Sequence, residues 1–454
     1  MSINKLLFYI SLFSRVIPGF ILFIFSGTIV AGIHLLKPVL LEMKTFHHFC
    51  QPDQKTCETQ ILWINLLPIG IAAGVNATSI LMGIAHDKWG GKRAYLIILV
   101  LLMTLSGILF SLFLAWDKLW QNFFWAPALL GVILVNSSAG LFFLLMSYAF
   151  VPGVSTRLST ILQSIFVTGW DLCASVFFIH VGLFKLGVPL LYSLLLTFTL
   201  SGAIWMIFVL LSKVSPYEEK PMEEEAESTP MIPMDNQPTP QTSAWSNILS
   251  PTFLVLFFWK TVSFLWFVTF IGTVYDRAYF LSGGNQEVAD HHTYVFSVIF
   301  PFVGAICGLF SGIVLYYIRL SSIILTVLST VSCILITIPY LPAQYATYVI
   351  FSAWRIFSFQ FVYSFVKEFY PITQFGVLTT IQFSVAGLIA YSSWGINAFV
   401  FRVLNGDFFI VNVGMSVISF VAHLMFIGVV FVKSHQQRKA SEEAQSVQDA
   451  SSEL

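Results

Sequence analysis

Long apolar segments, separated by short polar ones, run through most of the chain. A helix needs about 20 mainly apolar residues to cross the hydrocarbon core of a bilayer, and windows of that length select twelve segments. They predict helices at residues 15–42, 61–86, 94–116, 122–150, 158–182, 187–213, 252–275, 292–315, 320–340, 343–366, 372–398 and 408–432. The first and fourth segments are longer than a bilayer requires, so we expect them to be tilted or to extend beyond it.

One polar stretch divides the twelve segments into two sets of six. Residues 215–247 are acidic, rich in proline and poor in residues that could form a core, so we expect a disordered linker. The chain after residue 432 is also polar and solvated. The sequence therefore predicts an N-terminal six-helix bundle (1–213), an acidic, Pro-rich cytoplasmic linker (214–250), a C-terminal six-helix bundle (251–432) and a cytoplasmic tail (433–454).

Composition places these segments in a membrane. Hydrophobic residues make up 57% of the 454 residues, charged residues only 10%, and the mean hydropathy is +0.84, whereas soluble proteins are about 25% charged. The net charge of zero gives no indication of a nucleic-acid partner. The sequence shows no hydrolase elbow, metal-ligand cluster or nucleotide-binding loop, so we expect neither enzymatic activity nor a cofactor. We predict an all-α protein whose environment is the lipid bilayer.

The distribution of Lys and Arg predicts how the helices are oriented. With both termini in the cytoplasm, thirteen of these residues near helix ends lie inside and six lie outside, as the positive-inside rule requires. Cys50 and Cys57 then share the first outside loop, where a disulfide can form. Because this loop meets an oxidising space, we expect the protein to reside in the plasma membrane; an intracellular membrane is the alternative.

A glycine-rich, charged turn joins the second and third predicted helices. It reads GIAHDKWGGKR and resembles the signature of the major facilitator superfamily, in which a glycine precedes an acid and several bases. The matching residues are Gly83, Asp87, Lys88, Gly90, Lys92 and Arg93. Glycine lets two helices approach closely, an acid can interact with a helix terminus, and bases favour the anionic leaflet. We expect a gate here; the alternative is an ordinary basic turn.

The equivalent turn of the second half is degenerate. After the eighth predicted helix the sequence reads GIVLYYIRL, so Gly312 is followed by Tyr316 at the position where an acid is expected. Arg319 keeps the basic character of the turn. The second gate therefore lacks its carboxylate.

Six stretches resemble solute carrier family 43 of the same superfamily. They are CQPD and CETQ in the outside loop, WDLCASVF, LWFVTFIGT, RIFSFQFVYSFVKEFYPITQFGVL and DFFIVNV, in this order. The resemblance implies the major facilitator fold, with twelve transmembrane helices in two six-helix bundles. It also implies sodium-independent, facilitative transport of purine nucleobases or of large neutral amino acids. The aspartate in WDLCASVF and the LWFVTFIGT stretch are more similar to the nucleobase branch, so we favour nucleobases, with amino acids as the alternative.

Two charged residues within apolar segments are the main candidates for the substrate site. Arg355 is near the middle of the tenth predicted helix and Asp171 is at a similar depth in the fifth. A charge at the centre of a bilayer costs several kcal/mol unless something offsets it. Arg355 could donate paired hydrogen bonds to a carbonyl or carboxylate, and Asp171 could accept from a purine N–H. The alternative is a buried pair that only joins helices.

Further candidates are uncharged side chains on the seventh and tenth predicted helices, where rings could stack on a flat base. They are Trp266, Phe359, Tyr363 and Gln360. For each of the three aromatic residues, packing against the core or lipid is the favoured interpretation, whereas Gln360 could equally join helices. Lys260 departs from the family resemblance, which leads us to expect an apolar residue at its position. Its side chain could reach back to the interface or take part in the transport pathway.

The pattern of acids bears on energy coupling. Asp171 is the only acid well inside the predicted helices, so we expect transport by alternating access down the substrate gradient, that is, a uniporter. A proton-coupled exporter and a non-transporting membrane adaptor are alternatives from other classes. The sequence does not indicate an oligomeric state.

Overall fold

The computed structural model describes residues 3–26, 36–51, 57–115, 123, 125–149, 151, 154–211 and 244–452. Within these residues the protein is almost wholly helical and has no β-strand. Ten of the helices in this part of the chain are long and apolar enough to cross a membrane. The prediction of an all-α membrane protein is confirmed.

The long helices of the first half are α1 (Ile3–Ser26), α4 (Glu58–Trp89), α5 (Arg93–Ala115), α6 (Ala126–Tyr148), α7 (Thr156–Lys185) and α8 (Leu190–Leu211). Those of the second half are α10 (Pro251–Leu281), α11 (Gln286–Leu315), α12 (Ile318–Thr337), α13 (Ala343–Phe369), α14 (Phe375–Ala390), α15 (Ser392–Val403) and α16 (Phe409–Ser452). Shorter elements are α3 (Lys37–Glu42), α9 (Ala244–Ile248) and two 3₁₀ turns, His47–Phe49 and Ile372–Gln374.

Polar residues fix where several long helices begin. Ser155 precedes α7 and its side chain accepts a hydrogen bond from the amide of Leu158, at 3.3 Å. Ser250 caps α10 in the same way, with Pro251 following as the first helical residue. These residues satisfy amide groups that a helix start leaves without partners. Local sequence therefore sets where α7 and α10 begin, and both helices carry residues of the candidate site.

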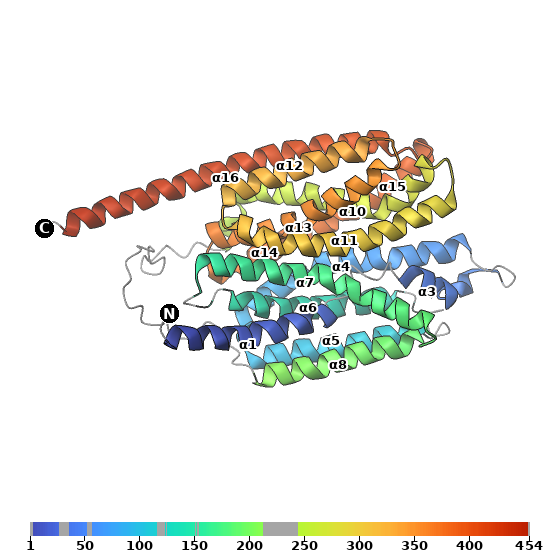
Figure 1. The fold of residues 1–454 in the computed structure, drawn as a ribbon, viewed down its shortest axis with the longest axis horizontal. Coiled ribbons are helices and arrows are strands. Elements are labelled where there is room, and N and C mark those ends of the chain that lie inside the picture. Colours follow the sequence, from blue (N-terminus) through green and yellow to red (C-terminus); the bar gives the residue numbers. More distant parts are fainter. Residues whose placement is uncertain are drawn as a thin grey trace.

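The helices form two groups that lie side by side (Figure 1). Helices α1 and α4 to α8 (blue to green) pack on one another, and α10 to α16 (yellow to red) form the second group. Between the groups, α4 packs along α14, and α7 packs along α11 and α13. We call these contacts the α4–α14 seam and the α7–α11–α13 seam. They are where residues of the two halves meet.

Several predicted helix boundaries are wrong. The first helix begins at Ile3 rather than near residue 15 and ends at Ser26; part of the predicted span, residues 27–35, lies outside the described residues. The helix passes through Arg15, whose guanidinium donates to the Ser11 hydroxyl one turn earlier, at 3.0 Å. In addition, the helix predicted at 372–398 is divided at Tyr391 into α14 and α15 and continues to Val403.

The predicted linker and tail are in part more regular than expected. Residues 214–243 lie outside the described residues, but 244–248 form α9, and Asn247 donates to the side chain of Gln374 at 2.8 Å. The last helix does not end near residue 432 but continues as α16 to Ser452, beyond the rest of the molecule (Figure 1). There Arg438 pairs with Glu442 one turn later, at 2.8 Å, which favours a helix in water. The exact domain boundaries stay a prediction.

Both ends of the described chain lie at the same end of the molecule (Figure 1). The turn between α4 and α5 lies at this end as well, because α4 runs from the opposite end, where Cys50 and Cys57 are bonded. We call it the α4–α5 end. It is the side that the distribution of bases assigns to the cytoplasm.

Candidate functional site

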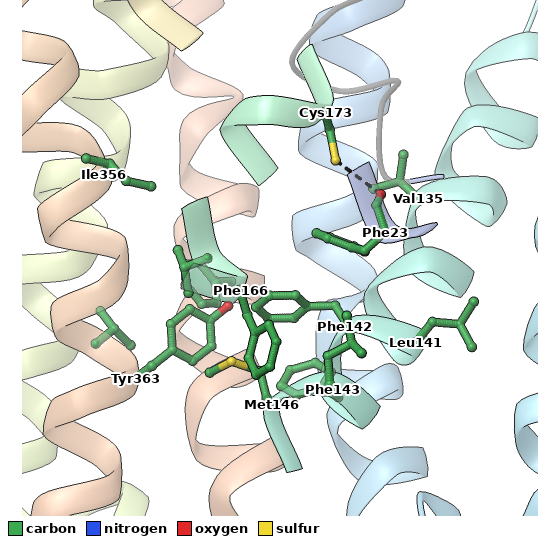
Figure 2. Close-up of a cluster of buried hydrophobic side chains, with 14 of the residues drawn as sticks. Phe23, Val135, Leu141, Phe142, Phe143, Met146, Phe166, Cys173, Ile356 and Tyr363 are labelled. Carbon is green, nitrogen blue, oxygen red and sulfur yellow. Dashed lines mark hydrogen bonds between the residues drawn. The ribbon is translucent and has the colours of Figure 1, made fainter. Parts of the chain in front are cut away.

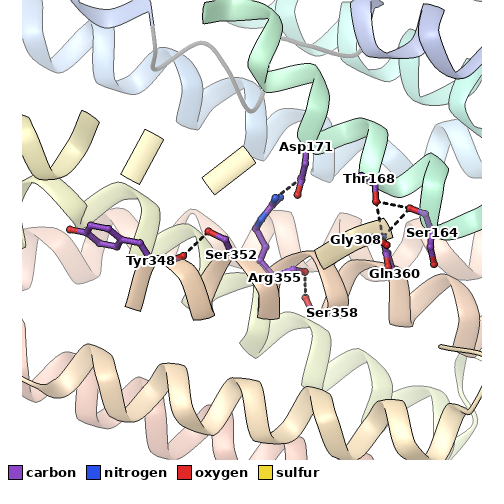
Figure 3. A network of polar contacts seen from close by, with 9 residues as sticks. All are labelled: Ser164, Thr168, Asp171, Gly308, Tyr348, Ser352, Arg355, Ser358 and Gln360. Atoms are coloured by element: carbon purple, nitrogen blue, oxygen red, sulfur yellow. Dashed lines mark hydrogen bonds and ion pairs between the residues drawn. The ribbon is translucent and has the colours of Figure 1, made fainter. Parts of the chain in front are cut away.

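An ion pair between Arg355 and Asp171 joins the two halves. Arg355 comes from the middle of α13 and Asp171 from the middle of α7, and their side chains point toward each other (Figure 3). Both residues are buried, with 7% and 2% of their surface exposed. Two charges brought together inside an apolar protein attract strongly, but their desolvation opposes this gain. The two intramembrane charges that the sequence singled out are therefore direct partners.

The ion pair leaves polar atoms without hydrogen bonds. Among the described residues, neither Oδ2 of Asp171 nor Nε of Arg355 has a hydrogen-bond partner, although both atoms are buried. The guanidinium carbon of Arg355 lies 4.1 Å from the centre of the Phe300 ring and 5.7 Å from that of Phe267. Aromatic rings partly stabilise a cation but do not accept its hydrogen bonds in full. The protein thus leaves the hydrogen bonds of one acceptor atom and one donor atom of the pair unsatisfied.

Three glycines allow α11 to approach this pair closely. Gly304, Gly308 and Gly312 are four residues apart and so lie on one face of α11. A methyl group on Gly304 would lie 3.1 Å from the Asp171 carboxyl carbon and 3.2 Å from a terminal nitrogen of Arg355. Small residues of this kind permit close helix packing in membranes. Any side chain at Gly304 would therefore displace the ion pair.

Gln360 connects three helices one to two turns from the ion pair. Its amide nitrogen donates to the Ser164 carbonyl at 3.0 Å, to the Thr168 hydroxyl at 3.3 Å and to the Gly308 carbonyl at 3.1 Å (Figure 3). Its amide oxygen accepts a hydrogen bond from Ser311. With its hydrogen-bonding groups used by the protein, Gln360 joins α13 to α7 and α11. The structure therefore favours a role in holding the halves together over direct ligand contact.

The same seam has a third polar contact nearer the α4–α5 end. The amine of Lys367, at the end of α13, donates to the Ser159 hydroxyl of α7 at 2.6 Å. Along α13 the three contacts occur at Arg355, Gln360 and Lys367, which span about 18 Å of helix. All three contacts must break if α7 and α13 separate between the middle of the protein and the α4–α5 end.

Of the aromatic candidates, Tyr363 and Phe359 lie close to the interface between the halves. The Tyr363 ring lies 6.0 Å from that of Phe142 on α6 (Figure 2), and 6.0 Å from that of Phe383 on α14. Phe359 is partly exposed, one turn from Arg355 on α13. Its ring stacks on Phe383, with centroids 5.5 Å apart.

Trp266 is placed differently. It is 1% exposed, and its ring packs against Trp354 at 4.5 Å and Phe351 at 5.3 Å. These contacts lie within the second half, and no ring contact joins Trp266 to Arg355 among the described residues. The neighbouring Phe267 contacts Arg355 instead. The expectation that Trp266 belongs to the site is therefore not supported by its packing.

Lys260 does not extend to the membrane interface. Its side chain is buried, with only 1% of the residue exposed, and its amine lies 3.6 Å from the centre of the Phe359 ring and 5.1 Å from that of Phe383. The snorkelling interpretation is wrong because the helix face that carries Lys260 is turned toward α13 and α14. A second basic side chain therefore lies beside the candidate site.

The gating motif fastens α4 to α14. The Asp87 carboxylate accepts hydrogen bonds from the backbone amides of Gly376 at 2.9 Å and Val377 at 2.8 Å, in the first turn of α14. Such amides carry the positive end of the helix dipole. Gly83 lies one turn before Asp87, and a methyl group there would lie 2.8 Å from the carbonyl carbon of Gly376. These residues close the α4–α14 seam at the α4–α5 end.

The remaining motif residues form the turn itself. Gly90 ends α4, and its amide donates to the carbonyl of His86 at 2.7 Å. The Lys88 amine lies 5.1 Å from the centre of the Trp89 ring. Lys92 and Arg93, where α5 begins, are exposed. Their positions fit contact with a charged surface.

Serines continue the α4–α14 seam toward the middle of the protein. The Ser79 hydroxyl donates to the Thr380 carbonyl at 3.1 Å and lies 3.0 Å from the Ser384 hydroxyl. The backbone amide of Ile80 donates to the Ser384 hydroxyl at 2.9 Å. Contacts between the halves therefore run from Asp87 to midway along α4.

The second-half turn keeps the glycine but not the carboxylate contact. Gly312 packs on α7, where a methyl group would lie 2.9 Å from the Ser164 side chain. Tyr316, at the acid position, is exposed and ends α11. The start of α7 is capped by its own Ser155. The degeneracy seen in the sequence thus has a structural counterpart: this helix start does not need an acid from α11.

Cys50 and Cys57 form a disulfide at the end of the molecule opposite the gating motif. The bond closes the segment between α3 and α4, of which residues 52–56 lie outside the described residues. Cys173 instead donates from its thiol to the Phe23 carbonyl at 3.3 Å, inside the apolar cluster of the first half (Figure 2).

Sequence reasoning missed the residues that contact the ion pair or Gln360. They are Phe267, Phe300, Gly304, Gly308, Ser164 and Thr168. One signal was available, because three glycines at four-residue spacing predict a closely packed helix face. The phenylalanines carry no such signal in a chain with 46 of them.

Comparison with solved structures identifies the fold. The chain superposes on the proton:xylose symporter XylE of the major facilitator superfamily with a TM-score of 0.62, covering 93% of this chain and 95% of that one at 12% sequence identity. It superposes on the human organic anion transporter MFSD10 with a TM-score of 0.60, covering 92% and 99% at 12% identity. The protein is thus a membrane protein with the major facilitator fold, as the motif predicted.

Among curated proteins, the chain is similar to the equilibrative nucleobase transporter 1 of Bos taurus. The two are 25% identical over 264 residues, which are 51% of this chain and 53% of that protein. The chain therefore matches about half the length of this relative. No protein-family model matches the chain. The similar proteins are transporters rather than enzymes, in agreement with the expectation that the chain is not an enzyme.

Proposed function

We propose that the protein is a transporter that moves a small polar organic solute across a membrane by alternating access. The observation that carries this proposal is the buried Arg355–Asp171 pair, which joins the two halves at mid-depth and keeps a free acceptor and a free donor atom. A ligand that satisfies both atoms would interact with both halves at once. Such a ligand can favour one arrangement of the halves over another, which is the requirement for coupling binding to a conformational change.

A purine nucleobase is the substrate that we propose. Asp171 would accept a hydrogen bond from a ring N–H, and Arg355 would donate to a ring nitrogen or carbonyl. The rings of Phe267 and Phe300 lie beside Arg355, and the Phe359 ring packs edge-on against Phe267; these rings could pack on a flat base. The similarity to a nucleobase transporter supports this choice. A large neutral amino acid, whose carboxylate would bind Arg355, is the competing substrate.

We propose that transport is passive and independent of sodium. Asp171, the acid at mid-depth, is paired with Arg355, and a paired carboxylate is a poorer proton carrier than a free one. A proton-coupled exporter remains the alternative of another class. For the orientation, we propose cytoplasmic termini and residence in the plasma membrane.

Uptake of radiolabelled adenine and leucine into proteoliposomes tests this function. Measurements without sodium, at two external pH values, compare the wild type with Asp171→Ala and Arg355→Ala. We expect saturable, pH-insensitive adenine uptake that both substitutions abolish. Leucine uptake that requires Arg355 but tolerates loss of Asp171 would instead assign the amino-acid substrate.

Two controls separate function from folding. Each variant is compared by thermal unfolding in detergent, because removing one partner of a buried ion pair costs about 3–5 kcal/mol of stability. Substrate-driven acidification of the vesicles would support the proton-coupled exporter. If folded wild-type protein moves neither solute, the substrate proposal is wrong and the adaptor interpretation gains support.

A further inference from the structure

Lys260 lies deep within α10 and has no carboxylate partner among the described residues. It is nine residues from Pro251, the first residue of the helix, which corresponds to about 14 Å of helical rise. Only 1% of the residue is exposed. The ion pairs formed by described residues do not include Lys260. Its contacts are with the faces of Phe359 and Phe383.

Aromatic rings alone do not offset the desolvation of this cation. Rings stabilise a desolvated ammonium group by about 2 kcal/mol, whereas the effective penalty for burying one ion is several kcal/mol. Phe359 and Phe383 stack on each other with ring planes 11° apart, so both present π-electron density to the amine. The protein thus holds the amine in place without giving its charged form a counter-charge.

The candidate site therefore holds two basic side chains, Arg355 and Lys260, and one acidic side chain, Asp171, among the described residues. Arg355 is one turn from Phe359 on α13, and Lys260 lies on the face of the Phe359 ring. Asp171 pairs with Arg355, which leaves no carboxylate for Lys260. An anionic group on a ligand beside partly exposed Phe359 would therefore stabilise the charged form of Lys260.

We propose that Lys260 makes this site selective for planar heterocycles that are anionic at neutral pH, such as oxypurines that have lost a ring proton. The inference rests on the proposed transport of purines and specifies which purines bind best. The Arg355–Asp171 pair binds the ring N–H and the hydrogen-bond acceptor groups that purines share, and Lys260 attracts the charged edge. Neutral purines such as adenine bind without this contribution.

The test compares urate, which is a monoanion at neutral pH, with neutral adenine. Initial uptake of each is measured in proteoliposomes containing the wild type, Lys260→Met, Lys260→Gln or Lys260→Arg. Binding of urate to the purified protein is measured separately by thermal stabilisation. Lys367→Met serves as the control, because Lys367 is also a partly buried lysine of the second half but contacts Ser159 in the α7–α11–α13 seam.

We expect the urate-to-adenine uptake ratio to fall at least tenfold in Lys260→Met and Lys260→Gln, which corresponds to about 1.4 kcal/mol. Lys260→Arg should keep the ratio within about threefold of the wild type, because the charge is retained. Lys367→Met should change both uptake rates alike and leave their ratio unchanged. Thermal stabilisation by urate should be lost in Lys260→Met and kept in Lys260→Arg.

Failure of this inference can be distinguished from failure of the proposed function. If adenine is transported but urate neither binds nor moves, or if Lys260→Met keeps the wild-type ratio, the inference is wrong and the transport proposal stands. If neither purine is transported, the transport proposal fails, and urate binding that depends on Lys260 then still decides whether this is an anion site. Should Lys260→Met not fold, the Gln and Arg variants give the same comparison.

Discussion

Replacing Asp87 by alanine should weaken the closure of the α4–α14 seam. The substitution removes two hydrogen bonds, of 2.9 and 2.8 Å, from the carboxylate to the amides of Gly376 and Val377. A hydrogen bond to a charged group contributes about 1.5–3 kcal/mol when buried. Asp87 is exposed, so solvent screening reduces the pair of bonds to about 2 kcal/mol in total. The closed arrangement should therefore lose about thirtyfold in its equilibrium with the open one.

Amide hydrogen exchange, followed by mass spectrometry, measures this opening. The informative amide is that of Ile80, which donates to the Ser384 hydroxyl across the seam at 2.9 Å and does not contact Asp87. Its exchange rate reports the free energy of local opening. In Asp87→Ala, the peptide containing Ile80 should exchange about thirtyfold faster. Asp87→Asn, which keeps one acceptor oxygen, should give an intermediate rate.

Asp407→Ala provides a matched control. The Asp407 carboxylate also accepts a hydrogen bond from a backbone amide at a helix start, that of Phe409 at 2.8 Å, but this contact lies within the second half. The substitution should leave exchange at Ile80 as in the wild type. If Asp87→Ala changes that exchange by less than about threefold, or if both variants change it equally, Asp87 does not hold the seam closed.

Three further predictions follow from other contacts. Gly304→Ala should separate the Arg355–Asp171 pair, because the added methyl group would lie 3.1 Å from the Asp171 carboxyl carbon; saturable uptake should fall at least about tenfold, and Gly428→Ala, where nothing lies within 4 Å, should transport normally. Gln360→Leu should lower the thermal stability by about 1–3 kcal/mol because the Ser164 and Gly308 carbonyls lose their shared donor; unchanged unfolding would contradict this. Cys50→Ser with Cys57→Ser should destabilise the protein by about 2.5 kcal/mol, the loop-closure contribution of a crosslink this short, and dithiothreitol should have the same effect on the wild type but none on the variant.

The site residues that could be predicted from the sequence are charged residues, which cost free energy in an apolar environment. Arg355 and Asp171 were identifiable because charges within apolar segments are rare unless they have partners, and their similar depth in two helices allowed contact. Asp87 was identifiable because a short charged turn between two apolar segments is a conspicuous interruption. In both cases the structure supplies the partner: Asp171 for Arg355, and the start of α14 for Asp87.

The sequence could not determine which helix faces meet. Helix α10 is apolar on most sides, so no polar stripe distinguishes the face of Trp266 from that of Phe267, and only the fold turns Phe267 toward Arg355. The direction in which the Lys260 side chain points is likewise determined by the fold. A long amine can reach water or lie on aromatic rings, and the choice depends on α13 and α14, which are about 100 residues further along the chain.

The most direct test of the transport proposal is adenine uptake by the double variant Asp171→Asn with Arg355→Gln. Both replacements remove charge while keeping polar side chains of similar reach, so a pair that only joins helices would be replaced by a neutral hydrogen bond. We predict a folded protein, with thermal unfolding close to that of the wild type, that shows no saturable adenine uptake because its ligand-binding groups are lost. If the double variant takes up adenine at the wild-type rate, the pair is structural and the substrate binds elsewhere.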